Sequence, residues 1–544
     1  MLYITPFLLS MVVTVAIMPV FQKLALRWRF VDQPNARKVH AAPIPRIGGL
    51  AMIIAVLVVA VVVLPLERAD WYCLAAATMI AVFGALDDRL DLDYRIKFGA
   101  QLAAAIAVVV GGDIQVHALT LDDTVLLPAW VSVPLSLFFL VGITNAINLA
   151  DGLDGLAGGT TFLSLGALAM LAHGAGQLAP AALALTFAGA VLGFLRFNTF
   201  PASVFMGDAG SQLLGFAVGV LSLRATQSAT SSLSAALPVL LLALPILDTL
   251  SVMVQRVSEG RSPFSPDKNH IHHKLLSLGF DHHEAVMIIY AVQADLFLLA
   301  YWLRYESDLV ILSVVSGFFA CVIGILQLAA RRHWRFRAPK DVPRGSALTR
   351  AVERLAAPEH LPRWSYLAVA VAVGVYAVLV MLETASVTSD VRLLLTALLA
   401  VTGTWLALLR IRPLSVVEKG SLYVTVTVLV YLDTVIVHGA MTLSIVNWSA
   451  ILAAAVGTIL RIRLSNERRF ELTPLDVIVV FAALVLPSLS DSLGLPQGSA
   501  VGIAKLMVLF YSVEVLVDRT EFPVVWLRIG MAAVLAGLIV RPMI

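Results

Sequence analysis

Long apolar runs alternate with short polar segments along most of the chain. Before residue 331 these runs predict about eleven membrane-spanning helices, some shorter than the usual ~20 residues, which neighbouring helices can shield. Beyond residue 363 they predict about seven more. We therefore expect an all-α polytopic membrane protein. The predicted spans are residues 3–23, 47–65, 71–86, 97–111, 130–147, 159–173, 178–195, 210–224, 235–256, 285–303, 308–330, 365–382, 391–409, 421–438, 447–461, 474–489, 499–516 and 523–540.

Composition agrees with this pattern. Of the 544 residues, 60% are hydrophobic and 13% are charged, and the mean hydropathy is +0.91, which excludes an ordinary soluble protein. A net charge of +3 gives no reason to expect a nucleic-acid partner. Cys73 and Cys321 lie inside apolar runs, so neither a disulfide framework nor a thiolate zinc site is expected. The first apolar run has no basic segment before it and no small-residue cleavage site after it, so we interpret it as a retained helix.

Basic residues gather in every second loop. The positive-inside rule places these loops on the cytoplasmic side of the cell inner (plasma) membrane and the N-terminus outside. The outer loop 112–129 alternates weakly between apolar and polar residues and predicts a short hairpin. The loops assigned to this side are residues 24–46, 87–97, 148–158, 196–209, 257–284 and 331–363, and together they hold most of the Lys and Arg residues before residue 364, although 148–158 itself has none.

The basic stretch 331–363 separates the region 1–330 from the region 364–544. It contains prolines and a short amphipathic piece, and we interpret it as a cytoplasmic or interfacial linker attracted to anionic lipid headgroups. In the region 364–544, Asp433 and Glu514 are charged residues within predicted spans. They are candidate functional positions, or residues that are paired inside the bundle or near an interface.

Adjacent carboxylates, Asp87 and Asp88, end the third apolar run. Like charges at a helix end raise one pKa or require a cation. A divalent cation held by few carboxylates and by phosphate oxygens is typical of Mg²⁺. The alternative is a solvated helix end whose charge is compensated by Arg89 and Arg95.

A second acidic segment, NAINLADGLDGLAGG, spans Asn145–Gly159. Asp151 and Asp154 are spaced to lie on one face at a helix end, close to the amide of Asn148, and the glycines allow backbone to approach a ligand. We expect this segment to bind a metal–phosphate substrate. The alternative is a glycine-rich turn with helix caps.

A third segment, GDAGS, places Asp208 at a helix N-terminus, where backbone N–H groups also favour anions. Phe205 precedes it by three residues and could stack on a base. A capping aspartate alone is the alternative. The glycine pair Gly48 and Gly49, at the start of the second predicted span, allows either tight packing or close approach of a ligand.

Cationic and imidazole groups complete the cytoplasmic loops. Lys38 and His40 are donors suited to phosphate oxygens, or simply topology signals. In the segment QRVSEGRSPFSPDKNHIHHK, capture of a diphosphate is favoured over a zinc site, because HIHH lacks the HExxH arrangement. His282 and His283 are expected to be surface residues. The donors of that segment are Arg256, Arg261, Lys268, His270, His272, His273 and Lys274.

Taken in order, RKVHAAPIPRIGG, DDRLDL, NLADGLDGLAGG, FNTFPASVFMGDAGS and SPDKNHIHH resemble the motifs of the polyprenyl-phosphate N-acetylhexosamine-1-phosphate transferases. This superfamily (glycosyltransferase family 4) includes phospho-MurNAc-pentapeptide translocase. RKxH together with HIHH is similar to the GlcNAc branch. The resemblance covers residues 1–330, including the eleven-helix core of that family. The region 364–544 departs from the family pattern, and its role is left open.

The resemblance implies a phosphotransferase that moves N-acetylhexosamine-1-phosphate, with GlcNAc favoured, from a UDP-sugar to undecaprenyl or decaprenyl phosphate. UMP would be released and a cell-envelope glycan, such as O-antigen lipopolysaccharide or another cell-wall polymer, would be started. The implied cofactor is Mg²⁺, for which Mn²⁺ could substitute. A homodimer is common in the family and is a further expectation.

The same resemblance suggests roles for individual residues. Asp208 corresponds to a magnesium ligand, and Asp87 and Asp88 to a pair of acids, one of which deprotonates the lipid phosphate; we also assign Asp88 to the metal. Phe205 corresponds to the aromatic that stacks on uracil. The nucleotide-binding turn corresponds to Asn148, Asp151, Gly152, Leu153 and Asp154, and the diphosphate- and sugar-facing loop to Arg256, His270, His272 and His273.

Several alternatives remain at this point. A covalent aspartyl-phosphate on Asp87 or Asp88 competes with direct displacement, which we favour because two anionic reactants need neutralisation and alignment more than a protein nucleophile. The donor could be another UDP-N-acetylhexosamine. A transporter or flippase of lipid-linked sugars predicts charges through the membrane midplane and half-repeats, which residues 1–330 do not show. An intramembrane aspartyl protease needs two facing aspartates within helices, whereas this chain offers glycine-rich loops and basic donors for phosphate.

Overall fold

The computed structural model describes residues 4–28, 30–32, 43–121, 123–228, 230–262, 269–332, 334, 361–407, 416–435, 441–464, 499–517 and 524–542. Nearly all of them are helical, and the only strands among them form two short antiparallel hairpins. One pairs β1 (Val31–Asp32) with β2 (Ile44–Pro45). The other pairs β3 (Ala118–Thr120) with β4 (Thr124–Leu126), as predicted for the loop 112–129.

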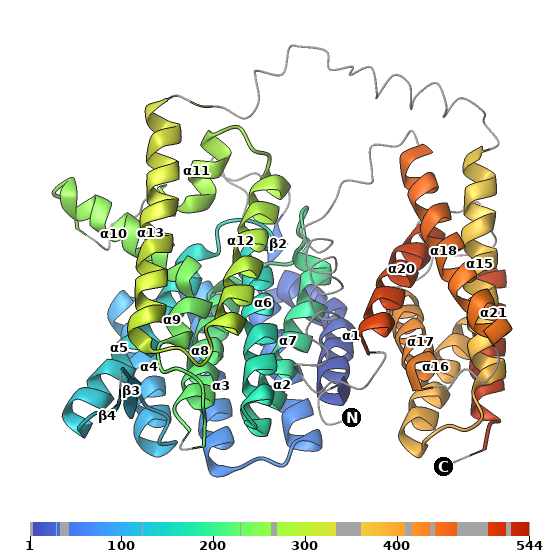
Figure 1. Ribbon diagram of the computed structural model, residues 1–544, viewed down its shortest axis with the longest axis horizontal. Helices are drawn as coiled ribbons and strands as arrows, with labels where there is room; N and C mark the ends of the chain where they lie inside the picture. The colour runs from blue at the N-terminus through green and yellow to red at the C-terminus, as the bar shows by residue number, and fades with distance from the viewer. Residues whose placement is uncertain are drawn as a thin grey trace. The chain divides into compact units, whose positions relative to one another are not determined.

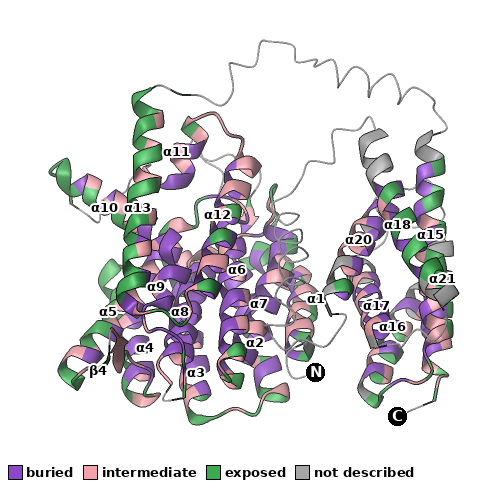
Figure 2. Ribbon diagram, viewed as in Figure 1, coloured by how far each residue is buried: buried purple, intermediate pink, exposed green. Residues whose placement is uncertain are grey.

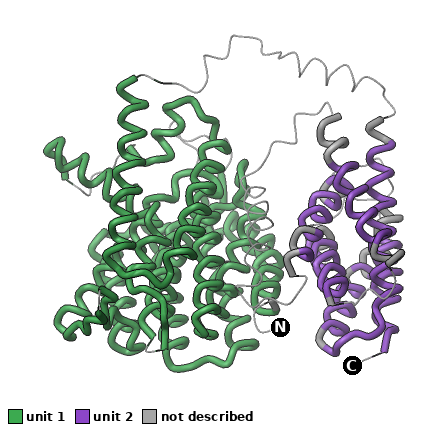
Figure 3. The backbone as a smooth tube through the Cα atoms, viewed as in Figure 1, with its two compact units in different colours: residues 1–340, 473–478 green, residues 341–472, 479–544 purple. Residues whose placement is uncertain are grey.

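The described helices divide into two compact units, each with its own core (Figures 1 and 3). Each of the eleven spans predicted before residue 331 contains helix. Of the helices in the described part of the chain, nine are long and apolar enough to cross a membrane, which confirms the prediction of a multi-pass all-α protein. The helices of the first unit are α1 (Ile4–Trp28), α2 (Gly48–Val63), α3 (Arg68–Leu90), α4 (Tyr94–Ile106, continued by the π-helical turn Ala107–Gly111), α5 (Ala129–Ala150), α6 (Leu156–Gly174), α7 (Leu178–Asn198), α8 (Gly207–Thr226), α9 (Leu237–Leu241), α10 (Ala243–Ser258), α11 (Ile271–Ser277), α12 (His282–Trp302) and α13 (Asp308–Arg331).

The second unit contains six described helices. The span predicted at residues 474–489 and most of the predicted linker lie outside the described residues. Tyr376, Leu395, Leu509 and Leu535 belong to the buried core of this unit. The helices are α15 (Leu361–Glu383), α16 (Ser389–Ala407), α17 (Val416–Val435), α18 (Met441–Leu464), α20 (Ser499–Val517) and α21 (Val524–Ile539).

The ninth predicted span is broken at Leu242, between α9 and α10. Pro245 has no N–H, so the carbonyl of Leu241 lacks the donor that a continuous helix would supply. The side chain of Gln293 on α12 replaces it, because Nε2 donates to that carbonyl at 2.9 Å. The break is therefore stabilised by a specific side chain from another helix.

Helix α8 lies at the centre of the first unit and is buried along almost its whole length (Figure 2). It packs against α2, α3, α5, α6 and α7. Its N-terminal turn carries Asp208. The helix with the most protein around it therefore delivers a carboxylate to the end of the bundle where α3 and α5 finish.

The loop before α2 joins the loop before α8 through backbone contacts. Gly48 N donates to Phe205 O at 3.1 Å and Gly49 N donates to Met206 O at 3.0 Å. A Cβ at Gly49 would lie 2.2 Å from Gly210 N, so no larger residue fits without a shift of backbone. The glycine pair therefore serves tight packing, one of its two predicted uses.

Candidate active site

Two acidic residues from α3 meet the N-terminus of α8. Asp88 is almost fully buried at its side chain (1% exposed), and its Oδ2 accepts a hydrogen bond from Ala209 N at 3.2 Å. Gly207 has φ +68°, and a Cβ there would lie 2.3 Å from Asp88 Oδ2. Only glycine therefore allows the carboxylate of Asp88 to reach the positive end of α8, where backbone N–H groups stabilise an anion.

Asp87 and Asp208 are in direct contact through their carboxyl groups. Lys97 Nζ lies 2.5 Å from Asp87 Oδ2, and Leu92 N donates to Asp87 Oδ1 at 2.8 Å. Gln212 Nε2 donates to Asp208 Oδ2 at 3.3 Å. Two carboxylates this close require a proton or a cation between them, because their charges otherwise repel.

Arg46 supplies positive charge to the same place. Its guanidinium forms an ion pair with Asp32, and its Nη1 lies 3.7 Å from Asp88 Oδ1. The sequence marks Arg46 only as one member of a basic loop, because Asp88 is far away along the chain. The structure makes it a functional candidate that sequence reasoning missed.

The turn between α5 and α6 is held from two other helices. Asp154 N donates to His282 Nε2 at 3.0 Å, and Asp154 Oδ2 accepts from Ala202 N at 2.9 Å. Gly155 has φ +80°, and its N–H donates to Asn198 Oδ1 at 3.0 Å. His282, predicted to be a surface residue, is half-buried, and its ring is a partner of this turn.

Asp151 begins the turn that follows α5, and Asn148 lies in the last turn of α5 itself, facing α8. Crowding by the surrounding protein, followed by the charges of Asp154 and Asp88, raises the pKa of Asp151, part of whose surface stays open to solvent. Ser211 Oγ donates to Asn148 Oδ1 at 2.5 Å, which fixes the end of α5 to α8. The acidic loops predicted separately from the sequence therefore converge on one end of the first unit.

The histidine loop is anchored by an acid within α10. His270 Nδ1 lies 2.8 Å from Asp248 Oδ2, and Ile271 N donates to Asp248 Oδ1 at 2.7 Å. Asp248 is only 5% exposed. Sequence reasoning missed it, although a charged residue inside an apolar run is itself a signal of function.

His272 packs directly against the turn between α5 and α6. A Cβ at Gly152 would lie 2.3 Å from His272 Nε2, and the rings of His272 and His273 are 4.2 Å apart. Burial, followed by the neighbouring His273, lowers the pKa of His272 to about 4. Its imidazole is therefore neutral at physiological pH.

For the remaining predicted site residues, the described part of the structure gives no contact that bears on their predicted role. Lys38 and His40 lie outside the described residues. Arg256 is buried near the C-terminal end of α10, and Leu153 is buried within the turn. Phe205 N donates to Pro45 O at 2.8 Å. Their roles toward substrate stay predictions.

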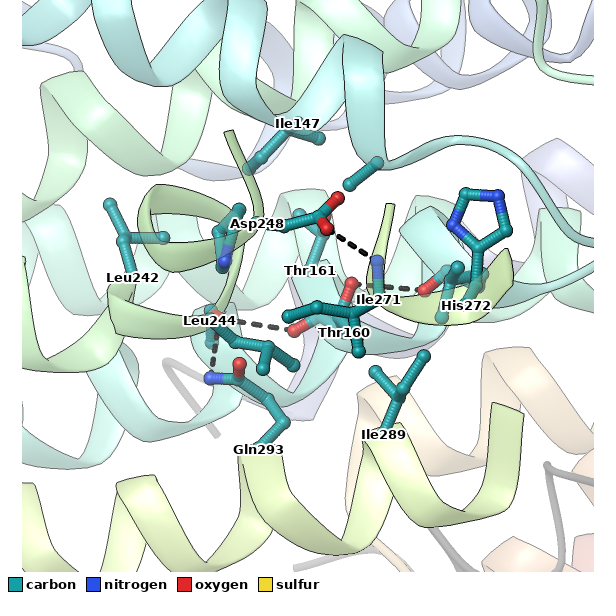
Figure 4. A pocket seen from close by; sticks show the side chains of 14 residues that line it. Ile147, Thr160, Thr161, Leu242, Leu244, Asp248, Ile271, His272, Ile289 and Gln293 are labelled. Carbon is teal, nitrogen blue, oxygen red and sulfur yellow. Dashed lines mark hydrogen bonds between the residues drawn. The ribbon is translucent and has the colours of Figure 1, made fainter. Parts of the chain in front are cut away.

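A cavity of about 40 Å³ lies behind the turn, between α5, α6, α10, α11 and α12 (Figure 4). Its walls are largely apolar. Within the described protein, Thr161 Oγ1, His272 Nε2 and Gln293 Oε1 have no hydrogen-bond partner, and all three residues line it. The acidic residues of α3 and α8 are not part of its lining, so the carboxylates and not this cavity mark the candidate active site.

The donor set fits a magnesium ion that is completed by substrate. Among the described side chains, no group of three His, Cys, Asp or Glu residues is arranged to hold a metal alone. Mg²⁺ usually takes one or two carboxylates and fills its shell with water and substrate phosphates. Asp88 and Asp208 meet at the N-terminus of α8 with an excess of negative charge, which suits that mode of binding.

Comparison with known proteins agrees with this geometry. Residues 71–226 match the model of Glycosyl transferase family 4. A probable undecaprenyl-phosphate N-acetylglucosaminyl 1-phosphate transferase of Bacillus subtilis is 36% identical over 291 residues, covering 53% of this chain and 81% of the relative. A decaprenyl-phosphate N-acetylglucosaminephosphotransferase of Mycolicibacterium smegmatis is 37% identical over 49% of this chain and 73% of its own.

The undecaprenyl-phosphate alpha-N-acetylglucosaminyl 1-phosphate transferase of Escherichia coli K12 is 34% identical over 49% of this chain and 75% of its own. These matches cover about half of this chain but most of each relative. The chain therefore belongs to glycosyl transferase family 4 and, within it, to the branch of polyprenyl-phosphate N-acetylglucosamine-1-phosphate transferases, which are phosphotransferases.

Proposed function

We propose that this protein transfers GlcNAc-1-phosphate from UDP-GlcNAc to undecaprenyl or decaprenyl phosphate, with Mg²⁺ as cofactor and UMP as the second product. The observation that carries the proposal is the convergence of Asp87, Asp88 and Asp208 with the turn that holds Asp151 and Asp154. An excess of carboxylates at one end of a membrane bundle is costly unless a cation and its anionic ligand bind there.

In the reaction, an oxygen of the lipid phosphate attacks the phosphorus that carries the sugar. A new P–O bond forms, and the bond from that phosphorus to the oxygen of UMP breaks. Direct displacement requires alignment and neutralisation of charge, with no protein nucleophile. Bound Mg²⁺ would neutralise the diphosphate and the departing UMP.

The carboxylates of the chain have separate tasks in this proposal. Asp88 and Asp208 hold the cofactor. Asp87, paired with Lys97, is the candidate to accept a proton from the lipid phosphate. Arg46, beside Asp88, is placed to pair with a phosphate oxygen as well as with the acid.

The nucleotide would lie on the turn between α5 and α6. Tyr290 Oη donates to Gly155 O at 2.5 Å, so the turn is held in place before substrate arrives. A site held in this way loses little conformational entropy on binding. We assign uracil to Asp154, Gly152 and Leu153, with Phe205 stacking on its face.

The histidine loop would receive the diphosphate and the sugar. Asp248 fixes the ring of His270 through Nδ1, which leaves Nε2 for a ligand. His272 is neutral, so it serves as a hydrogen-bonding group and not as a fixed cation. Positive charge at this loop comes from its arginine and lysine side chains.

The active site would face the cytoplasm of a cell with the protein in its inner membrane and the N-terminus outside. The distribution of Lys and Arg supports this orientation, because the loops on the side of the converging acids hold most of the basic residues, although the turn with Asp151 and Asp154 has none. UDP-sugars are cytoplasmic substrates. The homodimer stays a prediction.

The test is an assay of membranes that contain the full chain, supplied with polyprenyl phosphate and a panel of radiolabelled UDP-sugars. We expect label to enter lipid with UDP-GlcNAc, with dependence on Mg²⁺ and release of UMP. Asp88→Asn and Asp208→Asn abolish the signal, whereas Asp113→Asn in an exposed loop retains it. Absence of label with every UDP-sugar overturns the proposal and favours the transporter alternative.

A further inference from the structure

Three amide side chains, two of them buried and one half-buried, form a line that ends on Asp208. Asn145 Nδ2 donates to Gln101 Oε1 at 2.7 Å, and Gln101 Nε2 donates to Gln212 Oε1 at 2.9 Å. Gln212 Nε2 then donates to Asp208 Oδ2 at 3.3 Å. The amides come from α5, α4 and α8, and we name Asn145, Gln101 and Gln212 the amide relay.

The direction of the amide relay is fixed at its far end. Asn145 Nδ2 also donates to Val141 O at 2.8 Å, and a backbone carbonyl can only accept. The NH₂ group of Asn145 therefore faces α5 and Gln101, and the short contact of 2.7 Å requires the oxygen of Gln101 there, while Gln101 Nε2 also makes a longer contact of 3.4 Å with Asn145 Oδ1. Each amide then orients the next, so Gln212 presents an NH₂ group and never an oxygen to Asp208.

Burial of the polar groups of the amide relay costs free energy, so we expect their hydrogen bonds to have a task. Gln101 and Gln212 are each 4% exposed, and burial of an amide costs more than burial of an aliphatic side chain of similar size. Packing between α4 and α8 alone would be met by leucine. A hydrogen-bond donor aimed at Asp208 has a specific effect, because it holds one oxygen of the carboxyl and favours its charged form beside Asp87 and Asp88.

We propose that Gln101 and Gln212 are positioning residues that set the affinity of the site for its divalent cation. They touch neither substrate nor cation and act through Asp208. The inference rests on the proposed function, since it assumes that Asp208 holds Mg²⁺. It assigns a task to two residues of apolar helices that no motif of the sequence marks.

The sharpest test reverses the amide relay from its far end. Asn145→Asp can only accept, so Gln101 turns its NH₂ group toward residue 145 and Gln212 turns its oxygen toward Asp208. Binding of Mg²⁺ is measured as the concentration at half-maximal thermal stabilisation of the purified full chain without nucleotide. We expect this midpoint to rise about tenfold or more, the usual scale for a hydrogen bond to a charged group.

The sign of that change separates two explanations. An added negative charge near a cation site tightens binding of the cation by simple attraction, whereas the amide relay predicts weaker binding. In a Gln212→Leu background the relay is already broken, so Asn145→Asp has no further weakening effect. Tighter binding in Asn145→Asp, or equal weakening with and without Gln212, overturns the inference.

Two further variants serve as a backup and a control for this test. Gln101→Leu interrupts the same line without a new charge, so it gives the expected result even where Asn145→Asp does not fold. Gln293→Leu removes another buried glutamine, 1% exposed, and serves as the matched control. We expect it to change the melting temperature but not the Mg²⁺ midpoint.

A second readout is the rate. Saturating Mg²⁺ restores most of the transfer rate of Gln212→Leu, because the chemistry is intact and only binding of the cation is weakened. A wild-type chain with no Mg²⁺-dependent stabilisation overturns the proposed cofactor and this inference together. A normal wild-type response that Gln101→Leu and Gln212→Leu leave unchanged overturns the amide relay alone.

Discussion

Two clusters of buried charge, one in each unit, differ in how they are balanced. In the second unit, Lys505 Nζ lies 2.6 Å from Asp433 Oδ2 and donates to Asn447 Oδ1 at 3.0 Å, while Asn447 Nδ2 donates to Asp433 Oδ1 at 2.9 Å. Tyr376 Oη donates to Asp433 Oδ2 at 3.2 Å, and the ammonium lies 4.8 Å from the ring centre of Trp448. We call these five residues the charged cluster of the second unit.

The charged cluster neutralises itself, whereas the acidic site of the first unit does not. In the charged cluster, the carboxylate of Asp433 meets the ammonium of Lys505. Around α8, Asp87, Asp88 and Asp208 meet Lys97 and Arg46, with Asp151 and Asp154 nearby. The first arrangement is complete within the protein and the second needs a ligand, which is how a structural ion pair differs from a site.

This outcome bears on the charged residues predicted within the region 364–544. Asp433 is paired, as one of the two alternatives from the sequence expected. Its partner Lys505 was not anticipated. The side chain of Glu514 lies outside the described residues.

The strongest test of the comparison is Asp208→Asn. Under the proposed function Asp208 holds the cation, so its loss is expected to lower the transfer rate by about 10³-fold, on the scale of other losses of charge stabilisation in active sites. Stability is not lost, since the change removes repulsion with Asp87. Radiolabel entering lipid and the melting temperature measure the two effects. A strongly lowered melting temperature would contradict the inference that the site around α8 carries more negative charge than the protein itself neutralises.

The reverse pattern is expected for Lys505→Met. An unpaired buried carboxylate at Asp433 costs about 3–5 kcal/mol of stability, while the rate per folded molecule is unchanged. The double variant with Asp433→Leu recovers much of that loss, because no charge remains buried. Thermal unfolding of the three proteins in one detergent checks this. A rate that falls with normal folding would assign the charged cluster to the reaction instead.

A smaller effect on activity is expected from loss of the hydrogen bond between Tyr290 and the turn that follows α5. Tyr290→Phe removes one of two donors to the buried carbonyl of Gly155, which keeps its bond from Gly159 N, so the cost is about 0.5–1.5 kcal/mol. The turn then binds the nucleotide less well, so KM for the UDP-sugar rises more than kcat falls. Steady-state kinetics test this, with Tyr305→Phe at an exposed position as the control. An unchanged KM would show that the turn needs no such support.

The smallest effect concerns acid stability. The pKa of His272 is lowered to about 4 from the ordinary 6.5, chiefly by burial, so the folded chain stays neutral there while the unfolded chain takes up a proton. The contribution of His272 is fully present above pH 6.5 and is lost as pH falls toward 4. His272→Gln therefore shows a shallower loss of melting temperature between pH 6.5 and 4. Equal slopes would place His272 in a more open environment.

The sequence predicts the helices and the acidic loops well because both depend on local pattern. Apolar runs define the spans, and Asp151 and Asp154 stand out among glycines. Gln101 does not stand out, since its partners are 44 and 111 residues away along the chain. Arg46 and Asp248 were missed for the same reason, because their roles follow from contacts made only in the folded protein.

The contact between position 207 and Asp88 bears on inhibition of the enzyme. A Cβ at Gly207 would meet Asp88 Oδ2 at 2.3 Å, in a backbone conformation that other residues rarely adopt. A compound that binds against Gly207 would therefore contact a position at which a resistance substitution is sterically excluded.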